Sequence, residues 1–142
     1  MADKQIHLEI ITPDTSVFEG DVDFVVVRAV DGELGILPNH APLIASLDIS
    51  GLRYTKDDKK EYFFVAGGFM EVKNNRITIA APSAESATAI DIERAGRAEK
   101  RARERLSKSA AERQAEHIDM QRAELALRRA LERQRVARRN RG

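Results

Sequence analysis

Apolar and polar residues alternate along the first part of the chain with the period of β-strands. Ile6, Leu8 and Ile10 are separated by single polar residues, as in a strand that buries one face. Residues 23–30 are rich in β-branched residues and predict a well-buried strand. The N-terminal part of the chain is therefore expected to form a sheet.

Turn residues divide the next segment into further short strands. Asn74-Asn75 predicts a two-residue hairpin turn, because asparagine tolerates a positive φ. Gly67-Gly68 predicts a break between two strands. The strands expected around these turns are residues 43–47, 51–55, 61–66, 69–73 and 76–81. Many short strands with frequent turns predict a β-sandwich or flattened barrel over residues 1–85.

Beyond Pro82 the apolar spacing changes to that of helices. Asp91 is expected to cap a first helix or to lie in its first turn, and Asp119 to start a second, with a break at residues 107–109. The expected apolar stripes are Ala95, Ala98, Ala102 and Leu106 in the first helix and Ala123, Leu127, Ala130 and Leu131 in the second. Residues 90–142 are therefore expected to form an antiparallel two-helix hairpin, which makes the fold class α+β. One long helix running through residues 110–116 is the alternative.

The seam of this hairpin is rich in alanine, which buries little surface. At roughly 25 cal/mol per Å² of apolar area, such a seam contributes little free energy on docking. The hairpin is therefore expected to undock or refold while the β domain stays folded.

Charge and aromatic content separate the same two parts. Residues 1–90 hold 8 Lys and Arg against 14 Asp and Glu, whereas residues 91–142 hold 16 against 9. All seven aromatic residues lie before residue 70. This split indicates two differently built parts with a boundary near residues 81–90.

Few kinds of chemistry fit the composition. The chain has no cysteine, and His7, His40 and His117 are far apart, so no thiol chemistry and no metal site are expected. No phosphate-binding glycine loop and no nucleophile motif occurs. No apolar run is long enough to cross a bilayer, and the N-terminus lacks the features of a signal peptide. We expect a non-catalytic protein of a reducing, cytosol-like compartment.

The stretch GELGILPNHAPL at residues 32–43 is the most distinctive segment of the sequence. Two glycines and two prolines make it read as a stiff surface loop. As a string it resembles the signature of the ATP synthase ε subunit, named δ in mitochondria. Three other segments also resemble that family, in the same order along the chain: residues 10–20, the GGFMEV stretch at residues 67–72, and the last helix at residues 122–130.

The resemblance implies a fold and a role. It implies a ten-stranded β-sandwich followed by a helical hairpin, in a non-catalytic subunit of the central stalk that couples ion flow to rotation. Its implied partners are the γ subunit, the membrane rotor ring, which Glu33 and His40 would face, and the α and β subunits, where extended helices would inhibit ATP hydrolysis. The implied location is peripheral, on the cytoplasmic face of the bacterial cell membrane, without insertion into the bilayer.

The resemblance also implies a regulatory ATP site and no required cofactor. Some bacterial members bind ATP through an Ile/Leu-Asp-x-x-Arg-Ala motif, and residues 90–95 fit that motif fully. Arginine forks suit phosphate oxygens, and a carboxylate suits an adenine amino group or a ribose hydroxyl. The expected site residues are Glu85, Ile90, Asp91, Arg94, Ala95, Arg101, Arg122, Arg129 and Arg133. The connection at residues 107–116 is longer than in the family, which is expected to shift the second helix.

Two other classes of function stay open from the residues alone. Arginines crowd the end of the chain, which favours nucleic-acid binding, although no aromatic residue is interleaved for base stacking and the β part is acidic. We therefore expect no nucleic-acid partner. A β-sandwich binding module with a coiled-coil tail is the other alternative.

Overall fold

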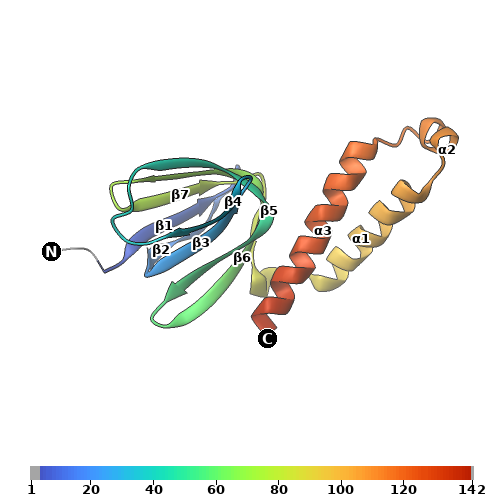
Figure 1. The fold of residues 1–142 in the computed structure, drawn as a ribbon. Coiled ribbons are helices and arrows are strands. Elements are labelled where there is room, and N and C mark those ends of the chain that lie inside the picture. Colours follow the sequence, from blue (N-terminus) through green and yellow to red (C-terminus); the bar gives the residue numbers. More distant parts are fainter. Residues whose placement is uncertain (1–3, 142) are drawn as a thin grey trace.

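The computed structural model describes residues 4–141 and shows a β-sandwich with a helical hairpin at one side (Figure 1). The hairpin projects away from the sandwich, and the chain returns so that its C-terminal end lies beside the sandwich. The strands are β1 (Ile6–Ile11), β2 (Ser16–Val22), β3 (Phe24–Ala29), β4 (Gly32–Ile36), β5 (Leu43–Lys56), β6 (Lys59–Lys73), β7 (Arg76–Ala80) and β8 (Ala84–Ser86). The helices are η1 (Ala87–Ala89), α1 (Ile92–Ser107), α2 (Ala110–Ala115) and α3 (Met120–Arg141).

The strands form one hydrogen-bonded sheet that folds over on itself. Their order is β2-β1-β7-β6-β5-β3-β4, and β8 pairs with β6. Phe18 of β2 stacks on Tyr54 of β5 with ring centroids 4.7 Å apart, although the two strands are not neighbours in that order. Alternate residues of β1, Ile6, Leu8 and Ile10, are fully buried between the layers, which confirms the predicted period. The predicted class of fold, a β-sandwich followed by helices, is confirmed.

The strand count differs from the expected ten. The structure has eight strands in residues 4–141, because β5 and β6 are long and each takes the place of two predicted strands. The predicted break at Gly67-Gly68 is wrong: both glycines have positive φ, yet the pairing with β5 continues on both sides of them. The partner on the other edge of β6 changes there, from β8 to β7. The Asn74-Asn75 turn is confirmed, with φ of 52° and 58°.

The signature stretch is only partly a loop. Residues 32–36 form β4, which pairs with β3, so the prediction of a loop is wrong there. Its alternating Leu34 and Ile36 turn inward, and Ile36 is fully buried. The remaining residues 37–42 form a surface connection, where the backbone N–H of Asn39 donates to the side chain of Asn75 over 2.8 Å.

The helical part is a hairpin with a structured tip. Figure 1 shows α1 and α3 side by side and α2 at the end distant from the sandwich. The side chains of Asp91 and Asp119 accept from the backbone N–H of Arg94 and Arg122. Asp91 is therefore the cap of α1 and not part of its first turn, and Asp119 starts α3 as predicted. The expected seam is confirmed at Ala95, Ala102, Ala123 and Ala130, all of which are buried.

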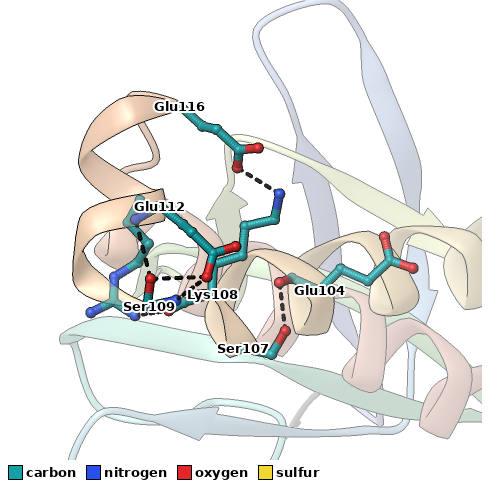
Figure 2. Close-up of polar contacts among 7 residues, drawn as sticks. Glu104, Ser107, Lys108, Ser109, Glu112 and Glu116 are labelled. Carbon is teal, nitrogen blue, oxygen red and sulfur yellow. Dashed lines mark hydrogen bonds and ion pairs between the residues drawn. The ribbon is translucent and has the colours of Figure 1, made fainter.

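One continuous helix does not form, because Lys108 and Ser109 adopt extended backbone angles. The Ser109 hydroxyl accepts from the backbone N–H of Glu112, whose carboxylate accepts in return from the backbone N–H of Ser109 (Figure 2). This capping box starts α2 anew. The added residues of the connection therefore fold locally, and α1 still packs along α3.

Candidate functional site

A cleft of about 520 Å³ lies where the base of the hairpin meets the sandwich. Four elements line it: β8 with the segment before it, η1, α1 as far as Arg101, and the middle of α3. The structure brings together seven of the nine residues expected at an ATP site, namely Glu85, Asp91, Arg94, Ala95, Arg101, Arg129 and Arg133. An antiparallel hairpin explains this, because it places the start of α1 opposite the far half of α3.

Two expected residues lie elsewhere. Ile90 is only 8% exposed and packs with Phe64 and Val136 in a small apolar cluster, so it supports the cleft from behind. Arg122 lies nearer the hairpin tip, in a neighbouring hollow that also contains Arg105. Arg129 and Ala126 line both hollows.

Sequence reasoning missed four lining residues: Ser83, Ala89, Ala98 and Ala126. Ala98 belonged to the predicted seam stripe, but nothing marked it as a wall of a cleft. Ser83 precedes the site by two residues and carries no motif. Small side chains at these positions leave the space that a ligand needs.

Arg133 is the most heavily engaged side chain of the cleft. Its Nε donates to Glu85 Oε1 over 2.6 Å, and its Nη2 donates to Ser83 Oγ over 3.2 Å. Its guanidinium carbon lies 4.5 Å from the centre of the Phe64 ring, in cation–π geometry. Arg133 thus joins α3 to β8 and β6 in one contact.

The other basic residues of the cleft are available to a ligand. Arg94, Arg101 and Arg129 form no ion pair with any residue of the described chain. Asp91 is engaged at the N-terminus of α1, and Glu85 is paired with Arg133. The cleft therefore has an excess of positive charge that suits an anion.

A limited contact docks the hairpin on the sandwich. Val136 and Ala137 of α3 are buried against Phe64, and a Cβ added at Gly51 would lie 2.8 Å from Val136 Cγ2. Arg128 Nη2 lies 2.7 Å from Asp48 Oδ1 of β5. This apolar cluster is separate from the core of the sandwich. The contact that docks the hairpin is therefore distinct from the packing of the sandwich core.

Polar contacts supplement the alanine seam between α1 and α3. The side-chain amide of Gln134 donates to Glu99 over 2.8 Å, and Arg103 donates to the same carboxylate. The Arg103 hydrogen bond, followed by that of Gln134, holds the pKa of Glu99 below its usual value. The carboxylate is therefore charged at neutral pH and links the two helices.

The two residues expected to face a rotor ring lie in different settings. Glu33 is exposed at the start of β4 and lines a small hollow with Arg135 and Arg139 of α3. His40 is half-buried in the connection after β4, where its Nδ1 lies 2.7 Å from the carbonyl oxygen of Ala41.

Within residues 4–141, no cluster of His, Asp or Glu has the arrangement of a metal site. Among those same residues, no helix has the length and apolar character needed to cross a membrane. The structure thus defines a class of two-part proteins: a β-sandwich carrying a docked helical hairpin with an anion-suited cleft.

The sequence matches a known family in both parts. Residues 5–87 match the beta-sandwich domain of the ATP synthase Delta/Epsilon chain, and residues 89–138 match its long alpha-helix domain. The chain is 47% identical over 132 residues to the ATP synthase epsilon chain of Halalkalibacterium halodurans, covering 93% of this chain and 96% of that one. It is 47% identical over 134 residues to the epsilon chain of Desulforamulus reducens, covering 94% and 98%.

A solved structure supports the fold. A chain of the Euglena gracilis mitochondrial ATP synthase, solved by cryo-EM with OSCP, F1 and c-ring, matches with a TM-score of 0.74 at 24% identity, covering 92% of this chain and 79% of that chain. The chain described here belongs to the ATP synthase Delta/Epsilon family, as an epsilon-type, non-catalytic subunit.

Proposed function

We propose that this subunit is a rotor component of the central stalk that couples ion flow to ATP synthesis, and that its hairpin regulates hydrolysis in response to ATP. In this proposal the sandwich docks on the γ subunit and on the membrane rotor ring, at the cytoplasmic face of the cell membrane. The compact hairpin is the permissive state, and the extended helices reach the α and β subunits and inhibit.

An exposed apolar patch on the sandwich supports docking to the γ subunit. Val30, Ile44 and Phe69 are 64%, 74% and 61% exposed. Strand register places them close together, because Ser46 is opposite Phe69 and accepts a hydrogen bond from the backbone N–H of Val30. A patch of large apolar side chains on neighbouring strands is typical of a protein interface.

The connection after β4 supports docking to the rotor ring. Pro38, Pro42 and the bond from Asn39 to Asn75 stiffen it, and a stiff contact suits the transmission of torque.

A cysteine in place of Glu33 or His40 is expected to cross-link to cysteines placed on polar loops of the ring. Cross-linking yield in assembled synthase is the measurement, with Glu104→Cys, exposed near the tip of the hairpin, as the control. Trapping of the γ subunit alone from both positions would show that the docking surface is misplaced.

The cleft supports ATP as the regulatory ligand. It combines guanidinium groups for phosphate oxygens with the carboxylates of Glu85 and Asp91 for donors of the base or sugar. Its walls come from both helices and from β8, so only the compact hairpin assembles it. A ligand that binds one conformation alone shifts the population toward that conformation.

Arg94→Ala is expected to weaken ATP binding about tenfold or more, since one charge-assisted contact to phosphate is lost. Arg97→Ala removes the same charge from an exposed position of α1 outside the cleft and is expected to leave the affinity within about twofold. Calorimetric titration of the purified chain measures both. Equal weakening of ATP binding by the two variants would show that the effect comes from the overall charge of the chain. Absence of ATP binding by the unmodified chain would refute the ATP site.

A further inference from the structure

The hollow at the hairpin tip shares two lining residues with the cleft that we assign to ATP. It encloses about 390 Å³, and its lining includes Arg105 from α1 and Arg122 from α3. Arg129 and Ala126 form the shared wall. The two hollows therefore lie next to each other along the hairpin, and together they are here called the arginine groove.

Arginines follow both sides of this groove. On α1 they run from Arg94 to Arg105, and on α3 from Arg133 back to Arg122, so each side extends about 16 Å at 1.5 Å per residue. The side chains of Arg105 and Arg122 form no ion pair within the described part of the chain. Three arginines line the tip hollow against two carboxylates, one of which is paired with Lys108, so the hollow has an excess of positive charge that favours binding of an anion.

Two acidic residues, Glu116 and Asp119, also line the tip hollow, and each has another partner. Glu116 Oε2 lies 2.6 Å from the ammonium of Lys108, which reaches across the tip (Figure 2). Asp119 accepts from the backbone N–H of Arg122 at the start of α3. Glu112 is occupied by the capping box of α2. The folded connection thus closes the end of the hairpin, and neither carboxylate of the tip hollow forms an ion pair with Arg105 or Arg122.

We propose that the arginine groove binds a linear polyphosphate chain, with the tip hollow holding the phosphates beyond the third. This inference rests on the proposed ATP site for the near end of the ligand. The chain of phosphates is supplied by an adenosine polyphosphate or by an inorganic polyphosphate. Arg129 contacts the middle of the chain, and Arg105 and Arg122 contact its distal end.

The test is calorimetric titration of the full chain, at fixed magnesium and salt, with ATP, adenosine 5′-tetraphosphate and inorganic tetraphosphate. The unmodified chain is expected to bind adenosine tetraphosphate about tenfold more tightly than ATP, the gain from one added bidentate contact. Arg105→Ala and Arg122→Ala are expected to remove that gain and leave ATP affinity within about twofold. Arg97 lies outside both hollows, so Arg97→Ala should preserve the gain in affinity and controls for the loss of one positive charge.

The outcomes separate this inference from the ATP proposal. ATP binding with no gain for the tetraphosphate, or equal weakening of both ligands by Arg122→Ala, overturns the extended groove and leaves the ATP site standing. Binding of inorganic tetraphosphate that depends on Arg122, without ATP binding, overturns the ATP site and supports a polyphosphate groove. Binding of none of the three ligands overturns both.

Discussion

Removal of residues 91–142 is expected to raise ATP hydrolysis by the assembled synthase about fivefold to tenfold, because most complexes are in the inhibited state before the removal and none are after it. The reason is that the helices alone reach the catalytic subunits in our proposal. The sandwich core is a separate cluster that includes Ile10, Phe63 and Ile79, so docking and coupling should persist. The measurement is hydrolysis by membranes, with ATP-driven ion pumping as the readout of coupling.

A matched variant distinguishes loss of inhibition from general damage at the docking contact. Truncation exposes Phe64, which α3 covers in the intact chain. Val136→Asp places a carboxylate beside Phe64 and Gly51 and so undocks the hairpin, while all its residues remain. This variant should inhibit hydrolysis more strongly than the unmodified subunit. If both changes alter hydrolysis in the same direction, inhibition by the extended helices is refuted.

Gly68→Ala is expected to destabilise the sandwich by about 3 kcal/mol or more, because it combines a steric clash with backbone strain. A Cβ at Gly68 would lie 2.1 Å from the carbonyl oxygen of Ala80 and 2.9 Å from Ala81 Cα. Gly68 also has a φ of +105°, which L-residues rarely adopt. The cause is the segment from β7 to β8, whose backbone runs very close to β6 at this point along the edge with which both strands pair.

Chemical denaturation of the purified chain measures this effect, with Gly96→Ala as the control. Gly96 lies within α1, and a Cβ there would meet nothing within 4 Å. Alanine at Gly96 should stabilise the helix by up to about 1 kcal/mol. A midpoint for Gly68→Ala close to that of the unmodified chain would contradict this close approach of the two backbones.

Local signals predicted much of this fold from sequence. Asp91 and Asp119 cap their helices and Asn74-Asn75 turns a hairpin, because each effect depends on neighbours within a few residues. The merging of the predicted strands into β5 and β6 could not be predicted from the sequence. Gly67-Gly68 marks a change of partner on one edge, and a change of partner depends on strands distant in sequence.

In the candidate site, too, local sequence signals were predictive and long-range contacts were not. The motif at residues 90–95 identified the base of the cleft, and the antiparallel hairpin brought Arg129 and Arg133 to it. The position of Arg122 in a separate hollow depends on how the connection folds, which the helical period does not report. The pairing of Arg133 with Glu85 joins residues 48 positions apart, and only the docked hairpin creates it.

The central claim is that ATP stabilises the compact hairpin, and energy transfer across the hairpin tests it most directly. The chain has no cysteine, so Lys100→Cys on α1 and Arg138→Cys on α3 give two unique, exposed sites for a donor and an acceptor. In assembled synthase, ATP should increase transfer as the helices close, and Arg94→Ala should shift this response to about tenfold higher ATP. Transfer that stays constant over the whole ATP titration, in a subunit that still binds γ, would contradict the claim.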